Sequence, residues 1–376
     1  MSDLDALLLV LSCLYAGFIA WCIAGWLRIK RFVPAQAGTV SISVIVPARN
    51  EAQTILSCLA SLEKQDYDKA LYEVIVADDD SDDATGDLSR KFAADHAGLK
   101  MKVIKPRRGT GGLLYKKNAI SEAVEQATGE LMITTDADCV LPPGYLRIIS
   151  SFHLEESASV ISMPLRLRNG NNLLEKMQSL EMAGLIGIGA ASIRNGMPIM
   201  ANGAAFAFDK KTFYEAGGYD AGSGASGDDT ELLMAARARQ SVRIAFLKSE
   251  EAIVTTDGMK SISSLISQRV RWASKIPTKL SVFTMMTASL AWLLHVGLLA
   301  EIFVHPLSPV WGIAWALKCI PELVFLTLLT GFIKNRKLLW YFLPAQLVYP
   351  FYIFLTGLLA LRGSYRWKGR KLAEGN

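Results

Sequence analysis

The chain has few of the residues that build disulfide frameworks or histidine metal sites. Its five cysteines are scattered without a CxxC pair, which excludes a disulfide-built secreted domain and a zinc ribbon. The four histidines also stand apart, with neither HxxxH nor HExxH spacing, so a histidine-based metal site is not expected. Charged residues make up only 20 % of the 376 residues and hydrophobic residues 51 %, which excludes a disordered chain. The formal net charge is +5, and we expect no nucleic-acid partner.

Apolar residues are concentrated at the two ends of the chain. Residues 4–26 are long enough, at ~1.5 Å rise per residue, to cross a hydrocarbon core of ~30 Å. The acidic Asp3 and Asp5 flank the start of this segment and basic residues follow it from Arg28, the reverse of a cleaved signal peptide. The pattern predicts an N-terminal membrane anchor, residues 1–30, with the following chain in the cytosol, at the inner membrane if the source is bacterial.

A second apolar region, residues 280–363, contains three candidate spans: 280–304, 310–333 and 338–361. Three crossings from the cytosol would place the basic tail, residues 364–376, outside. The positive-inside rule instead places both this tail and the basic loop 334–337 in the cytosol.

Two explanations of this conflict are open. The last segment contains Pro344 and Pro350, and it could enter and leave the membrane on one face. Alternatively the segment 310–333, which holds Lys318 and Glu322, is not a plain span.

Between these regions, residues 40–276 read as alternating strands and helices. Strands are expected at 41–46, 72–77, 102–105 and 130–135, with helices at 52–64 and 114–128 among them. Such alternation predicts a parallel sheet, which binds ligands beyond the carboxyl ends of its strands. The polar clusters 49–51, 78–83 and 136–138 all follow strands, so we expect the site there.

Acidic residues follow two of these strands. Asp136 and Asp138 suit a hard divalent cation that also binds phosphate oxygens, although a polar turn would give the same pattern. Asp78 and Asp79 could accept hydrogen bonds from a ribose or a base.

Further along the chain, the segment 109–112 with neighbouring basic residues such as Lys117 reads either as a phosphate loop or as a solvated basic turn. It lacks the GK[ST] sequence of a P-loop. Asp228 and Asp229 read either as a helix cap or as a general base that takes a proton from a sugar hydroxyl.

An amphipathic stretch, residues 262–276, precedes the second apolar region and contains Gln268, Arg271 and Trp272. One interpretation is a basic interfacial helix. The other is that Arg271 balances the charge of a diphosphate while Trp272 packs on an acceptor sugar or lipid.

These clusters, in this order, resemble those of the family 2 glycosyltransferases, in particular the membrane-embedded branch with a (Q/R)xxRW motif. That branch includes ceramide glucosyltransferase-like enzymes and the cellulose, hyaluronan and poly-N-acetylglucosamine synthases. The resembling segments are 44–51, 77–79, 135–138, 201–206, 228–229 and 268–272. The sequence departs from the family pattern at Asp80, where glycine is usual, at Asp228, where glutamate is usual, and in the loop 109–117.

The resemblance implies an α/β domain of the GT-A (nucleotide-diphospho-sugar transferase) fold, with a mostly parallel sheet and transmembrane helices at both ends. It implies catalytic roles for Asp229 as the base, with Asp228 and Arg271, and a Mg²⁺ or Mn²⁺ ion on Asp136 and Asp138. The nucleotide-sugar would contact Pro47, Asn50, Glu51, Asp78, Asp79, Lys117 and Asp136, and the acceptor would contact Gln268 and Trp272.

The implied reaction is inverting transfer of a sugar from a nucleotide diphospho-sugar, with UDP as the expected carrier, to an acceptor lipid in the membrane. A processive polysaccharide synthase acting on a growing glycan is an alternative. A non-catalytic, membrane-anchored nucleotide-binding partner is another, although the expected base, Asp229, is present. A transporter is disfavoured by the large polar insert between the apolar regions.

Overall fold

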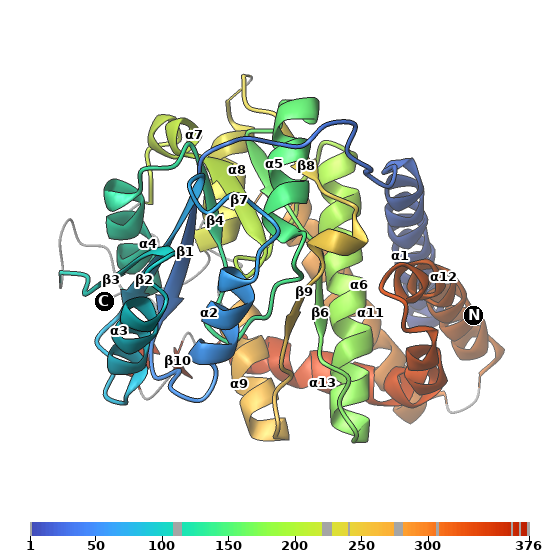
Figure 1. Cartoon of the computed structure of the whole chain (residues 1–376). Helices are drawn as coiled ribbons and strands as arrows, with labels where there is room; N and C mark the ends of the chain where they lie inside the picture. The colour runs from blue at the N-terminus through green and yellow to red at the C-terminus, as the bar shows by residue number, and fades with distance from the viewer. Residues whose placement is uncertain are drawn as a thin grey trace.

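The structure is a computed structural model that describes residues 2–107, 115–219, 228–239, 241–273, 281–305, 308–361, 364–367 and 370–373. An α/β domain with helices around a central sheet occupies most of the molecule, and long apolar helices pack against one side of it (Figure 1). The predicted segment 109–112 lies outside the described residues.

The central sheet has seven strands in the order β3-β2-β1-β4-β7-β5-β8. These strands are β1 (Ile42–Ala48), β2 (Tyr72–Asp78), β3 (Lys100–Ile104), β4 (Leu131–Thr134), β5 (Val160–Ser162), β7 (Phe206–Asp209) and β8 (Ile244–Phe246). The strands β3, β2, β1 and β4 are parallel, whereas β7 runs antiparallel to both β4 and β5. The predicted mostly parallel sheet is therefore confirmed. Its inner strands are apolar runs because helices cover both faces.

Six helices of the α/β domain accompany this sheet: α2 (Ile55–Glu63), α3 (Thr85–Asp95), α4 (Tyr115–Gln126), α5 (Tyr145–Glu156), α7 (Lys210–Glu215) and α8 (Asp228–Arg237). The helix predicted at 52–64 is shorter at both ends, the helix predicted at 114–128 ends at Gln126, and the strand predicted at 102–105 begins at Lys100. A short parallel pair, β6 (Leu165–Leu167) and β9 (Val254–Thr256), lies apart from the sheet. The predicted tail contains an antiparallel pair, β10 (Ser364–Trp367) and β11 (Arg370–Ala373).

Four helices of the described chain are long and apolar enough to span a membrane. They are α1 (Asp3–Arg28), α11 (Val282–Val304), α12 (Pro309–Phe332) and α13 (Phe342–Ala360), the last continued from a 3₁₀ turn, η3 (Arg336–Tyr341). Two further helices are α6 (Leu173–Arg194), which contacts α1 and α12 as well as β6 and β8, and α9 (Ile262–Ala273), which contacts α13.

The carboxyl ends of α1 and α12 meet at one carboxylate of the α/β domain. Glu250 lies 3.3 Å from Arg31, which follows α1, and also pairs with Lys334, which follows α12. Lys248 donates from Nζ to the carbonyl oxygens of Trp26 and Ile29, at 3.0 Å each. The basic residues after both helices therefore lie on the same side of the helix bundle.

The helix α13 is arranged differently from the other apolar helices. It runs across the lower edge of the molecule, whereas α6 runs upward, and it contacts α9 (Figure 1). The strand β10, which follows α13, also lies beside α9. The chain therefore leaves α13 beside α9.

One hydrophobic core joins the apolar helices to the sheet. Its members come from α1, β1, β2, α6 and α12 and include Cys22, Trp26, Ile45, Ile75, Ala183, Ala190, Phe325 and Leu329. Two glycines permit the close approach of these elements. A Cβ on Gly187 of α6 would lie 2.5 Å from Leu329, and one on Gly25 of α1 would lie 2.8 Å from the carbonyl oxygen of Ala191. Helix α6 therefore packs against both the apolar helices and the α/β domain.

Candidate active site

The carboxyl ends of β1, β2 and β4 lie at one edge of the sheet. The parallel register pairs Ala48 with Asp78 and Ile45 with Thr134, so the segments after these strands are neighbours. The expected polar clusters therefore converge as parallel pairing requires.

A buried arginine ties two of these segments together. Arg49, 8 % exposed, donates through Nη1 to the carbonyl oxygens of Asp79, at 2.7 Å, and Asp80, and its Nη2 lies 3.1 Å from the Asp82 carboxylate. The amide nitrogen of Asp82 donates to Oδ1 of Asn50 over 2.8 Å. These bonds fix the backbone that presents Asp79, one of the predicted nucleotide ligands.

Three more of the predicted nucleotide ligands lie at this edge of the sheet. Pro47 lies within β1 beside Ala77 of β2. Asp78 is buried, and its Oδ1 accepts a hydrogen bond from the amide of Ser81 at 3.1 Å. Glu51 accepts a hydrogen bond from the hydroxyl of Thr54 at 2.7 Å.

The backbone conformation at Asp80 suits the glycine that the family pattern has at this position. Its φ is 60°, in the left-handed region, where glycine is at ease and aspartate is among the best-tolerated other residues. Asn50 has a similar φ of 52°. The Asp80 carboxylate lies 3.5 Å from Nζ of Lys105, which balances its added charge.

The predicted metal ligands follow β4. Asp136 lies 2.7 Å from Nζ of Lys116, and Asp138 accepts a contact from the thiol of Cys139 at 3.6 Å. Burial, followed by the negative charge of Asp138, Asp136 and Glu51, raises the pKa of the Cys58 thiol beneath them. Burial and the same two aspartates also raise the pKa of Cys139.

This local chemistry fits a divalent cation. The carboxylates of Asp136 and Asp138 supply only oxygen donors, which Mg²⁺ and Mn²⁺ prefer. Both residues also line one and the same cavity. These two residues would hold the ion, with Lys116 as a further positive group.

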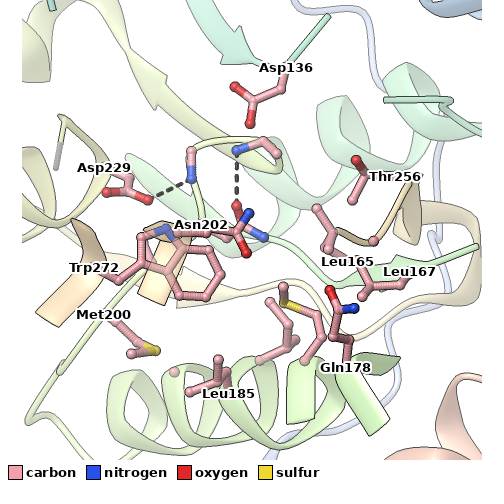
Figure 2. A pocket seen from close by; sticks show the side chains of 18 of the residues that line it. Asp136, Leu165, Leu167, Gln178, Leu185, Met200, Asn202, Asp229, Thr256 and Trp272 are labelled. Carbon is pink, nitrogen blue, oxygen red and sulfur yellow. Dashed lines mark hydrogen bonds between the residues drawn. The ribbon is translucent and has the colours of Figure 1, made fainter. Parts of the chain in front are cut away.

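The predicted base begins helix α8. Asp229 accepts hydrogen bonds from the amide of Gly203 through Oδ2 and from the amide of Thr230 through Oδ1, each at 2.7 Å. Figure 2 shows its carboxylate beside the segment 201–206, which Asn202 also stabilises by accepting from the amide of Ala204 at 3.1 Å. The side chain of Asp228 lies outside the described part of the chain.

A cavity of about 270 Å³ brings the separated motifs together. Six predicted residues line it: Asp136, Asp138, Asp229, Gln268, Arg271 and Trp272. Apolar residues such as Leu185 and Met200 also line it, and Figure 2 shows both of them below Trp272 in this view. The predicted residues Pro47, Asn50, Glu51, Asp78, Asp79 and Lys117 are not among the described residues that line this cavity.

Helix α9 is held against α6 by a buried pair that sequence reasoning missed. Arg269, 7 % exposed, donates to both carboxylate oxygens of Glu181 on α6, with Nη2 at 2.6 Å from Oε2 and Nε at 3.1 Å from Oε1. The hydroxyl of Tyr352 on α13 donates to the same carboxylate at 3.1 Å. The guanidinium of Arg269 also lies 4.1 Å from the ring centroid of Trp272. This network positions the motif residues and links them to α13.

The adjacent lysines of α4 have opposite surroundings. Lys116 lines the cavity beside Asp136, whereas Lys117 is 1 % exposed and lies 2.5 Å from Glu231 on α8. Neighbouring helix positions point about 100° apart, which explains why only one lysine reaches the cavity. Sequence reasoning placed both lysines beside the predicted phosphate loop and preferred Lys117, whereas Lys116 is the one that lines the cavity.

Known proteins share this sequence pattern and fold. The model of glycosyl transferase family 2 matches residues 43–214, and that of glycosyl transferase family group 2 matches residues 131–355. The glycosyltransferase AglE of Haloferax volcanii is 33 % identical over 98 residues, which are 26 % of this chain and 30 % of that protein. The poly-beta-1,6-N-acetyl-D-glucosamine synthase of Staphylococcus epidermidis is 30 % identical over 149 residues, 39 % of this chain and 34 % of that protein.

The matched stretches therefore span about a third of the length of these relatives. Among solved structures, the mannosyltransferase PcManGT of Pyrobaculum calidifontis, in complex with GDP-Man and Mn²⁺, has a TM-score of 0.60 and 20 % identity. That likeness covers 94 % of this chain and 99 % of the mannosyltransferase chain, and it supports the GT-A fold. The protein belongs to the family 2 glycosyltransferases.

Proposed function

We propose that the protein is a membrane-bound inverting transferase that moves one sugar from a nucleotide diphospho-sugar to the hydroxyl group of a membrane lipid. The observation that supports this most directly is the cavity, which has two acidic motifs at one end and the apolar side of α6 at the other. A carboxylate base is therefore near a surface that suits an acyl or isoprenoid chain.

In this reaction Asp229 removes the proton from the acceptor hydroxyl. The acceptor oxygen bonds to the anomeric carbon as the bond between that carbon and the diphosphate oxygen breaks, which inverts the configuration. Asp136 and Asp138 would hold a divalent ion, which would supply positive charge for the departing diphosphate. Arg271 supports the same leaving group, and Trp272 packs on the acceptor.

The nucleotide occupies the edge after β1 and β2 in this proposal. Asp79 and Glu51 contact the nucleotide with Pro47, Asn50 and Asp78, whereas we assign the phosphate side to Lys116 rather than Lys117. The reason is that Lys117 is buried against Glu231. UDP is the proposed carrier.

We further propose that the α/β domain lies in the cytosol and that α1, α11 and α12 cross the membrane while α13 enters and leaves on the cytosolic face. The basic residues Arg31 and Lys334 share Glu250 of the α/β domain, as the positive-inside rule expects for one side. The crosswise course of α13 and the position of β10 beside α9 support the return of the tail to that side.

The test uses the full chain in detergent with Mn²⁺ or Mg²⁺, a panel of UDP- and GDP-sugars, and a total lipid extract. Released nucleotide and labelled products are measured together. A glycolipid carrying one sugar supports the proposal, provided that Asp229→Asn abolishes it.

A processive synthase is the second candidate because one of the similar proteins is a poly-N-acetylglucosamine synthase. Long insoluble product in the same assay would establish it and overturn single transfer. Nucleotide binding without release, with every donor and lipid fraction, would instead favour the non-catalytic partner.

A further inference from the structure

We propose that Asp5, Glu301 and His305 bind a divalent transition-metal ion, for which zinc is the best match, at the end of the helix bundle remote from the active site. Asp5 lies in the first turn of α1, and the other two residues lie at the end of α11. One ligand atom from each residue lies within 4.8 Å of the other two. The ion would connect α1 to α11.

This site is separate from the sugar-transfer site. Helix α1 is 26 residues long, and its opposite end, near Trp26, contacts Lys248 of the α/β domain. At ~1.5 Å per residue, Asp5 is roughly 30 Å along the helix from that contact. The ion proposed for Asp136 and Asp138 would therefore be a different one.

Two buried oxygens of the cluster accept no hydrogen bond from a donor group of the described residues. They are Oδ1 of Asp5, a residue that is 8 % exposed, and Oε2 of Glu301, which is 0 % exposed. The other oxygen of Asp5 accepts from the amide of Ser2 at 2.7 Å. The other oxygen of Glu301 lies 3.2 Å from Nδ1 of His305 and 3.4 Å from the hydroxyl of Ser308. Each carboxylate therefore keeps one oxygen available for a ligand.

The charge of the cluster also favours a bound cation. With both carboxylates ionised, a neutral His305 leaves a charge of −2, and even a protonated His305 leaves −1. Buried charge of this kind is strongly unfavourable in apolar surroundings unless a cation compensates it. A divalent ion bound by two carboxylates and a neutral imidazole would leave no net charge.

The donor set selects the class of ion. One imidazole nitrogen and two carboxylate oxygens match the ligands of zinc and related transition metals, whereas Mg²⁺ and Ca²⁺ favour sites built from oxygen alone. The side chain of His305 is 45 % exposed, so an ion has a route in and water can complete its coordination.

A single proton shared by the two carboxylates is the competing explanation. It would satisfy both unpartnered oxygens, and with a protonated His305 it would also remove the net charge. Metal content distinguishes the two explanations, because only the proposed site retains zinc.

The experiment measures zinc in full-length protein that carries Asp136→Asn and Asp138→Asn, so that the active site contributes no ion. The protein is stripped with EDTA in detergent, loaded with Zn²⁺, desalted and analysed by mass spectrometry of the metal. Glu301→Gln and His305→Ala are added separately to this background, and His96→Ala, a histidine of the α/β domain, is the matched control. Thermal unfolding of each sample is recorded with and without zinc.

We expect about one zinc per chain in the background protein and in His96→Ala, and close to none in Glu301→Gln and His305→Ala. Zinc should raise the melting temperature of the first two proteins only. His305→Ala also removes a partner of the buried Glu301 carboxylate, so the effect of zinc on each variant is compared with its own metal-free sample. The proposal is overturned if the background protein retains no zinc, as a shared proton predicts, or if His305→Ala retains it. Because the active-site aspartates are absent, neither result depends on the transferase reaction.

Discussion

Nζ of Lys117 on α4 lies 2.5 Å from the carboxylate of Glu231 on α8, and only 1 % of the lysine side chain is exposed. Glu231 is two residues beyond Asp229, so this pair holds the beginning of the helix that carries the proposed base. We expect Lys117→Met to leave a buried carboxylate without this partner and to lower the free energy of unfolding by about 3–5 kcal/mol. Chemical unfolding in detergent measures the loss.

The double variant Lys117→Met/Glu231→Leu separates this structural role from nucleotide binding. If the pair only positions α8, the double variant should recover most of the stability and should bind donor like the parent protein. A double variant that folds well but has lost donor affinity would return Lys117 to the nucleotide site.

Asp229→Asn keeps the size of the side chain but removes the proton acceptor. We expect kcat to fall roughly 100- to 10,000-fold while the donor still binds, because general base catalysis has this magnitude. Asp257→Asn is the matched control, since Asp257 lines the same cavity and pairs with Arg168 at 2.7 Å. Equal losses in the two variants would argue against a specific role for Asp229.

Removal of the divalent ion should stop transfer. Treatment with EDTA, or the substitution Asp138→Asn, should lower kcat by at least roughly 100-fold, equivalent to about 3 kcal/mol of transition-state stabilisation. Added Mn²⁺ or Mg²⁺ should restore the EDTA-treated parent, whereas Asp138→Asn should need far higher concentrations. Full activity of the parent after exhaustive chelation would exclude a metal-dependent reaction.

The apolar wall of the cavity should determine acceptor affinity. Leu185 projects from α6 into the cavity, as Figure 2 shows. Leu185→Asp should raise KM for a lipid acceptor roughly 10-fold or more, through lost apolar contact, and leave KM for the donor unchanged. Leu154→Asp on α5, where the leucine is 51 % exposed, should change neither constant. An unchanged lipid KM in Leu185→Asp would place the acceptor chain elsewhere.

The contact between α1 and the α/β domain should make stability depend on pH. Burial, followed by the positive charge of Arg31, lowers the pKa of Lys248 from 10.5 to about 8. Between these values the unfolded chain binds the proton and the folded protein does not. Stability should therefore increase as the pH rises from about 8 towards 10.

Melting temperatures from pH 7.5 to 10 measure this contribution. Lys248→Met should reduce the increase with pH, whatever its effect on absolute stability. Lys260→Met, which removes an exposed lysine, should retain the slope of the parent. Identical slopes in the parent and in Lys248→Met would contradict the assignment.

The sequence predicted the strands and the position of the site, because both follow from the local order of apolar and acidic residues. Buried apolar strands ending in aspartates identified the edge of the sheet, because parallel strands end together. Sequence favoured Lys117 over Lys116, whereas Lys116 is the lysine that pairs with Asp136, because the outcome depends on which side of α4 faces that residue.

Contacts between residues far apart in the chain also could not be predicted from the sequence. Arg269 and Glu181 are separated by 88 residues, and no periodicity connects them. For the last apolar segment sequence left two explanations open, because the composition of α13 is that of a spanning helix and its packing against α9 and α11 is not visible in sequence. The left-handed φ of Asp80 shows why the family pattern has glycine at this position, which the sequence alone does not reveal.

The core shared by α1, α6, α12 and the sheet has a practical consequence for preparing this enzyme. Truncation before β1 or after α9 would remove Trp26 and Leu329 and leave their apolar partners on α6 facing water. Such a fragment would aggregate rather than behave as an independent catalytic module. Exchange of the α/β domain between relatives would meet the same obstacle, because α1, α6 and α12 would have to be transferred with it.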